Sequence, residues 1–193
     1  MFLTACQTTP VNYSQKTQGY WKAKALVNDK KNNINHIVYL EINAIKNKKL
    51  RMDIISPLGG HLASIILNGK KASYLNMEKK IIYTGRASAR ALAKVASVPI
   101  DPKLFYNVVF DLPVKNKSWN CINDEAGNIK LCKGLKTGTT ISWGRTTDAK
   151  KSVFVENRKV KLQINFRSYK SEVEARSNLF EFKKIPGFKN IRI

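Results

Sequence analysis

The stretch Leu50-Arg-Met-Asp-Ile-Ile-Ser-Pro-Leu-Gly-Gly60 decides the fold. Its first half alternates apolar and polar residues, which predicts a β-strand over Leu50–Ile54 with one buried face. Its second half is typical of a tight turn, because proline fixes one φ angle and glycine permits conformations that other residues avoid. We predict a loop in which Pro57 and Gly59 push Leu58 into solvent. The alternative is an ordinary turn whose leucine is tucked against the core.

The same period of two recurs on both sides of this stretch, most clearly in 38–44 and 160–166. Turn residues such as Asn68-Gly69 separate the strands, and closely spaced strands with short turns favour an antiparallel meander. The sequence therefore predicts a mainly β (α+β) fold, a curved antiparallel sheet or unclosed β-barrel. Further strands are predicted at Trp21–Val27, Leu62–Leu67, Ala72–Asn76, Lys80–Tyr83, Ser118–Asn123, Ile129–Leu135, Thr139–Gly144, Ser152–Val155 and Asn178–Lys184.

Two short helices interrupt the strands. Residues 86–96 are rich in alanine, which has the highest helix propensity, and Val98-Pro99 follows them. Asp101 and Pro102 look like the N-cap and first residue of a second helix. We expect both helices to cover the concave face of the sheet as a lid over an apolar cavity. The residues predicted to line that cavity are Leu40, Ile42, Met52, Ile54, Leu92, Val95, Phe105, Val108 and Val109.

Two of the three cysteines, Cys121 and Cys132, flank the turn sequence Asp-Glu-Ala-Gly-Asn. A hairpin centred on Ala126-Gly127 places the two cysteines directly opposite each other, close enough for a disulfide. A disulfide implies an oxidising compartment. The alternative is two reduced cysteines packed within a sheet.

The remaining cysteine lies at the N-terminus, where Leu3-Thr-Ala-Cys6 fits a lipobox. Polar residues follow it, as expected for a tether between a membrane and a domain. We therefore predict that residues 1–17 are a truncated signal remnant, a lipobox with its lipidation site at Cys6, and a flexible tether. Residues 18–193 would form a single domain. Since only five residues precede Cys6, we expect the precursor to start upstream of Met1. Gln7, in place of an aspartate, favours the outer membrane. An incidental buried or reactive Cys6 is the alternative.

The chain of 193 residues carries 35 basic and 13 acidic side chains, a formal net charge of +22. Such charge is compatible with solvated lysine-rich strand faces, an anionic membrane surface or nucleic acid. No recognisable nucleic-acid motif accompanies the charge, so we predict no nucleic-acid partner. Three cysteines and two histidines do not provide a zinc cluster, and we predict no metal and no cofactor.

Catalytic motifs are also missing from the sequence. His36 and His61 are the only side chains with an ordinary pKa near neutrality, and neither accompanies a nucleophile motif. We therefore predict a binding protein rather than an enzyme.

The order of elements resembles the LolB family of outer-membrane lipoprotein receptors. The resemblance rests on Ser56-Pro-Leu-Gly59 after a strand, the two helices, and Leu112-Pro113 after the second helix. It covers roughly residues 19–166. Val108 and Asp111 stand where that family has tryptophan and glycine.

This resemblance implies an unclosed barrel with a helical lid, and a membrane-insertion loop of Pro57, Leu58 and Gly59. It implies that acylated lipoproteins arrive from a LolA-like periplasmic carrier and enter the outer membrane, with the protein lipid-anchored on its periplasmic face. We expect a monomer. A LolB-like lipoprotein with another lipid cargo, or a basic envelope interaction module without a cavity, remain the alternatives.

Overall fold

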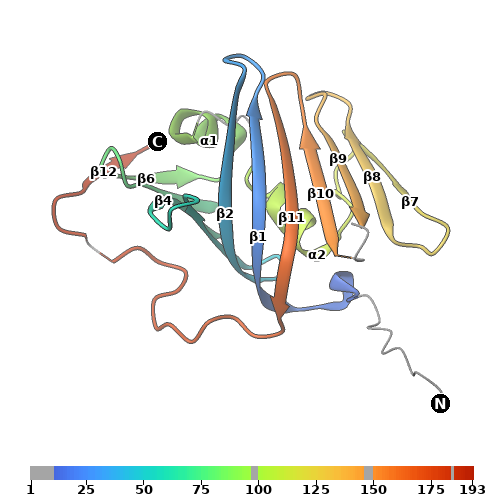
Figure 1. The fold of residues 1–193 in the computed structure, drawn as a ribbon, viewed down its shortest axis with the longest axis horizontal. Helices are drawn as coiled ribbons and strands as arrows, with labels where there is room; N and C mark the ends of the chain where they lie inside the picture. Colours follow the sequence, from blue (N-terminus) through green and yellow to red (C-terminus); the bar gives the residue numbers. More distant parts are fainter. Residues whose placement is uncertain (1–10, 97–99, 146–149, 184) are drawn as a thin grey trace.

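One sheet dominates the molecule (Figure 1). The computed structural model describes residues 11–96, 100–145, 150–183 and 185–193, and only the backbone of residues 94–96. Within them, 12 strands form a single sheet in the order β12-β6-β5-β4-β3-β2-β1-β11-β10-β9-β8-β7. They are β1 (Gln18–Asp29), β2 (Ile34–Ile45), β3 (Lys49–Ile55), β4 (His61–Asn68), β5 (Lys71–Asn76), β6 (Ile81–Arg86), β7 (Trp119–Asn123), β8 (Ile129–Gly134), β9 (Thr140–Arg145), β10 (Lys151–Glu156), β11 (Val160–Lys170) and β12 (Lys189–Arg192).

The sheet is antiparallel throughout except at one edge, where β12 runs parallel to β6. Its two edge strands, β12 and β7, do not pair with each other, so the sheet is unclosed. Two helices, α1 (Ala89–Ala96) and α2 (Leu104–Phe110), lie behind it in Figure 1. The prediction of a mainly β fold with an unclosed sheet and two short helices is confirmed.

Both helices begin later than the sequence predicted. Arg86 is still the last residue of β6, and the hydroxyl of Ser88 accepts a hydrogen bond from Ala91 N at 3.2 Å, as an N-cap does. Asp101 accepts from the backbone N of Lys103 at 3.0 Å, and its carbonyl accepts from Leu104 N. Asp101 therefore closes a turn that precedes α2. Every residue of α2 except Asn107 is buried.

The C-terminal segment differs from the prediction. The described part of the predicted strand Asn178–Lys184 forms turns instead, and residue 184 lies outside the described residues. The segment crosses the outer face of the sheet, where Asn43 exchanges two hydrogen bonds with Glu174 (2.9 and 3.1 Å) and Arg51 donates to the carbonyl of Leu179 (3.2 Å). It packs over β2 and β3, whose hydrogen-bonding edges are already occupied, so it cannot pair as a strand there. Figure 1 shows it continuing to β12 beside β6.

The N-terminal segment also packs on the sheet. Tyr13–Gln15 form the 3-10 helix η1, and the Tyr13 ring is buried edge-on against Tyr169, with ring centroids 5.2 Å apart. The packed part of the chain thus begins before residue 18, within the predicted tether. Cys6 lies outside the described residues. No helix in the described part of the chain is both long and apolar enough to span a bilayer.

Candidate functional site

An apolar cavity of about 190 Å³ lies between α1, α2 and the inner face of the sheet. The alternation of the strands creates its wall, because residues two apart point to the same face. Ala25 and Val27, Val38 and Leu40, and Met52 and Ile54 are such pairs on β1, β2 and β3. The lining residues are Ala25, Val27, His36, Val38, Leu40, Met52, Ile54, Ile65, Leu92, Phe105 and Leu162, of which only His36 is polar.

A wider hollow of about 670 Å³ adjoins this cavity. The two share the lining residues His36, Ile54, Ile65 and Leu92, so they lie side by side. The wider part also contains His61, Leu62 and residues 74–78, and it is more polar. Its size falls within the roughly 300–1,000 Å³ of ordinary small-molecule sites. The two spaces together could accept an extended apolar group whose polar end stays near solvent.

Five of the nine residues predicted to line the cavity do so, namely Leu40, Met52, Ile54, Leu92 and Phe105. Ile42, Val108 and Val109 do not, which corrects the expectation from the sequence. All three are buried in the packed core. α2 fills that region, and its Phe110 packs edge-on against Trp21 at 5.2 Å between centroids. The side chain of Val95 lies outside the described residues.

Lys151 fixes the C-terminus of α2 to the sheet. Its buried ammonium donates to the carbonyl of Val109 at 2.7 Å and pairs with the Asp111 carboxylate at 2.7 Å. The rings of Tyr13 and Phe166 lie 4.6 and 4.4 Å from it. Burial, partly offset by the carboxylate of Asp111, lowers the pKa of Lys151 to about 8.

Asp111 explains one departure from the LolB pattern. It adopts the left-handed conformation (φ 49°) as the C-cap of α2, where a glycine is usual. Aspartate tolerates that conformation better than most residues, and here its carboxylate also neutralises Lys151. Asp111 thus both ends α2 and supplies the counter-ion of Lys151.

The loop predicted for membrane insertion projects from the sheet. Gly59 N donates to Ser56 O at 2.9 Å, and Gly60 N donates to the Ser56 hydroxyl at 3.0 Å, which closes a turn with Pro57 and Leu58 at its tip. Gly59 has a φ of +86°. Leu58 is 98% exposed, so it is not tucked against the core.

A polar cluster that the sequence did not reveal supports this loop. Buried Asp53 accepts from Arg51 Nε at 2.7 Å and from the hydroxyl of Ser64. His61 Nε2 lies 2.8 Å from the Ser64 oxygen and 3.0 Å from the carbonyl of Ala63. Because the hydroxyl of Ser64 donates to a carboxylate and is fully buried, the cluster joins β3 to β4 and offers no free nucleophile.

Cys121 and Cys132 pair directly across β7 and β8, in the register that the sequence indicated, and form a disulfide. The turn between them contains Gly127 at φ 79°. The disulfide closes the hairpin at the free edge of the sheet. It lies away from the apolar cavity, so it contributes to the frame rather than to the site.

A second pocket, of about 660 Å³, is basic. The sequence did not predict it, because its residues come from distant segments. Lys103, Lys115, Arg158 and Lys159 line it, and Asp101 is the one carboxylate among the described lining residues. The other lining residues are Ala89, Leu104, Asn107, Val114, Asn116, Ser118, Trp119, Thr137, Thr139 and Asn157.

Solved structures share this fold along most of the chain. A LolA superfamily protein from Nitrosomonas europaea has a TM-score of 0.56 and 8% identity, covering 87% of this chain and 91% of its own. A conserved protein from Thermus thermophilus has a TM-score of 0.50 and 9% identity, covering 95% of each chain. A putative outer membrane lipoprotein-sorting protein domain from Vibrio parahaemolyticus has a TM-score of 0.49 and 7% identity, covering 84% and 88%. The chain has the LolA-superfamily fold.

No protein-family model matches the sequence, and no curated protein is significantly similar to it. At identities below 10%, the likeness to the solved structures concerns the fold.

Proposed function

We propose that this protein binds acyl chains in its apolar cavity and works as a lipid-anchored envelope protein. The observation that carries the proposal is the cavity itself, whose wall has one polar residue among eleven. A folded protein normally fills its interior, and a retained apolar space is typical of a binding site. Each methylene moved from water into the cavity would contribute about 0.8 kcal/mol.

The finer proposal is a LolB-type receptor. It would accept acylated lipoproteins from a LolA-like periplasmic carrier and release them into the outer membrane. Transfer between successive apolar sites needs only differences in affinity, so we propose a binding protein rather than an enzyme. Diacylation of Cys6 would hold the domain at the outer membrane, since more than one acyl chain gives stable anchoring.

Leu58 would insert into the bilayer during release. Its exposure and its polar, hydrogen-bonded turn support this role. Leu62, the second residue of β4, adds exposed apolar surface close to this loop. An apolar tip at this end lies next to the wider hollow through His61 and Leu62.

The acyl-binding proposal is tested by native mass spectrometry of the purified protein. We expect adducts with the mass of acylated peptides or diacyl lipids. An adduct of phospholipid without lipoprotein would favour the alternative of another lipid cargo. Protein that neither retains nor takes up any acyl compound would contradict the proposal.

The insertion role is tested by Leu58→Glu. We expect unchanged folding and carrier-to-receptor transfer, but at least about a tenfold loss of lipoprotein insertion into vesicles, because a glutamate resists burial in the bilayer. Leu135→Glu is the matched control, since Leu135 is also a turn leucine, 71% exposed, in the β8–β9 connection. Equal insertion by both variants would exclude a role for Leu58.

A further inference from the structure

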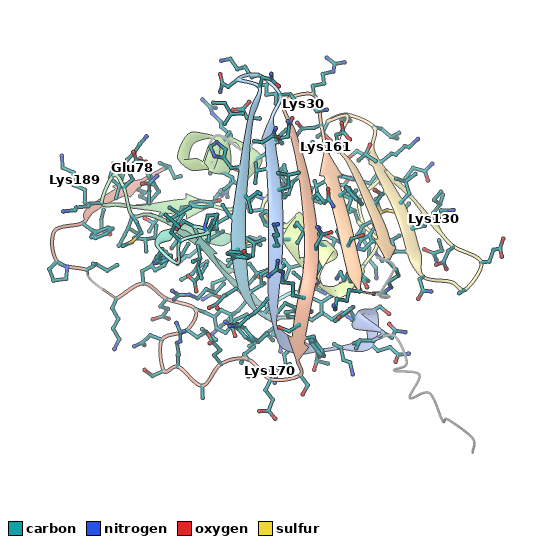
Figure 2. The ribbon with its side chains drawn as sticks, in the orientation of Figure 1. Lys30, Glu78, Lys130, Lys161, Lys170 and Lys189 are labelled. Atoms are coloured by element: carbon teal, nitrogen blue, oxygen red, sulfur yellow. A yellow bond between two sulfur atoms is a disulfide. The ribbon has the colours of Figure 1, made fainter. Side chains whose placement is uncertain are left out.

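The described residues of the basic pocket carry an excess of positive charge. Four cations face one carboxylate, and none of the four makes an ion pair within the described residues. By contrast, Lys22, Lys30 and Lys151 each pair with a carboxylate elsewhere. Figure 2 shows Lys30, Lys130, Lys170 and Lys189 at separate places around the molecule. The four pocket cations instead surround a concave space.

The pocket is assembled at one end of the sheet. Lys115 comes from the connection between α2 and β7, and Arg158 and Lys159 come from the β10–β11 turn. Lys103 precedes α2. Thr137 adds a hydroxyl group and Trp119 its indole ring, while the hydroxyl of Ser118 already donates to Asn116 Oδ1 at 2.9 Å. Ammonium, guanidinium and hydroxyl donors around one space are the groups that bind phosphate oxygens.

The same three elements line the basic pocket and the apolar cavity. On α1, Ala89 faces the pocket and Leu92, one turn later, faces the cavity. At α2, Leu104 lines the pocket and its neighbour Phe105 lines the cavity. Around the start of β11, Lys159 lines the pocket and Leu162 lines the cavity. The first turn of α2 is therefore a thin partition between a cationic space and an apolar one.

We infer that the ligand is an amphiphile bearing a phosphate, with its phosphate in the basic pocket and its acyl chains in the apolar cavity. This inference rests on the proposed acyl-binding function and names the chemical class of the ligand. Neither space alone indicates an amphiphile; the indication comes from their adjacency, since Leu104 and Phe105 are neighbours and the ligand would pass around the first turn of α2.

The test uses the full chain and four soluble probes. Dioctanoyl phosphatidate carries both groups, dioctanoylglycerol carries only the chains, and glycerol 3-phosphate and inorganic phosphate carry only the anion. Binding is measured by calorimetry. We expect phosphatidate to bind at least about tenfold more tightly than dioctanoylglycerol, since one charged hydrogen bond contributes roughly that factor.

The pocket is then tested by the triple variant Lys103→Gln, Lys115→Gln, Lys159→Gln. We expect it to lose the preference for phosphatidate while it binds dioctanoylglycerol as the parent does. The control is Lys130→Gln, Lys133→Gln, Lys170→Gln, which removes equal charge from exposed positions that do not line the pocket. We expect the control to keep the preference.

The outcomes separate the two proposals. If the parent binds neither dioctanoyl compound, the acyl-binding function fails. If it binds both equally, or if the two triple variants weaken phosphatidate binding alike, the inference is overturned while acyl binding stands. If inorganic phosphate or glycerol 3-phosphate binds as tightly as phosphatidate, the pocket serves a free anion, which also overturns the assignment to a lipid.

Discussion

The two halves of the interior are built from the same alternating strands, yet one is filled and the other is hollow. In the filled half, Trp21, Val109 and Phe110 are fully buried between α2 and the sheet. In the hollow half, Val27 and Val38 are only partly buried and line a space that none of the described side chains fills. Phe105 is the residue of α2 that lines the hollow half. The difference teaches that the position of one seven-residue helix decides where the site lies.

The strongest test of whether the two halves differ in packing uses two phenylalanines of α2. Phe110→Ala in the filled half should lower the free energy of unfolding by about 3–5 kcal/mol, because it creates a new void. Phe105→Ala should cost about half as much, since it only enlarges an existing cavity. Urea unfolding measures both. Equal costs would mean that the two halves are packed alike.

Two positions on β1 sharpen the comparison at the next level. Ala23 and Val27 point to the same face, but only Val27 lines the cavity, where it is partly exposed. Ala23→Leu should destabilise the protein by about 1–3 kcal/mol through overpacking, since Ala23 is buried. Val27→Phe should leave stability nearly unchanged and should abolish binding of dioctanoylglycerol. A similar loss of stability in both variants would argue against an open cavity at Val27.

The smallest expected effect concerns the ion pair that holds the filled half. The pKa of Lys151 is lowered from 10.5 to about 8, so above pH 8 the unfolded chain binds more protons than the folded one. The contribution of Lys151 to stability should therefore rise by about 2 kcal/mol between pH 8 and 10, while the raised pKa values of Tyr74 and Tyr106 act in the opposite direction near pH 10. The check is urea unfolding at both pH values, in the parent and in Lys151→Met, which should lack this contribution. Parallel pH profiles would show that Lys151 does not titrate in this range.

Much of the frame was predictable because period-two alternation marks each strand by itself. The register of the Cys121–Cys132 hairpin followed from its turn residues alone. The prediction failed where tertiary contacts decide. Leu179 and its neighbours alternate like a strand, but the sheet positions next to β2 and β3 were already taken. β12 was missed because four residues give too short a pattern.

The site was predictable only in part, for a related reason. Alternation says that Ile42 points inward, and helical spacing says that Val108 and Val109 share a face with Phe105. It does not say which inward-facing residues meet another side chain and which meet empty space. That depends on where α2 packs against the inner face of the sheet. The basic pocket escaped prediction because Lys103, Lys115 and Lys159 meet only after folding.

The packing of Tyr13 on the sheet limits how far Cys6 can lie from the folded domain. The β-sheet register places Ile55, just before the Leu58 loop, level with Lys24, about 20 Å along β1 from Gln18 at a rise of about 3.3 Å per residue. Residues 7–12 can span at most about 20 Å when fully extended. If Cys6 carries the lipid, the packing of Tyr13 would limit the distance between the anchor and the sheet to the length of residues 7–12. Release of residues 13–17 would nearly double that length. The buried ring of Tyr13 would then determine how far above the membrane the domain could stand.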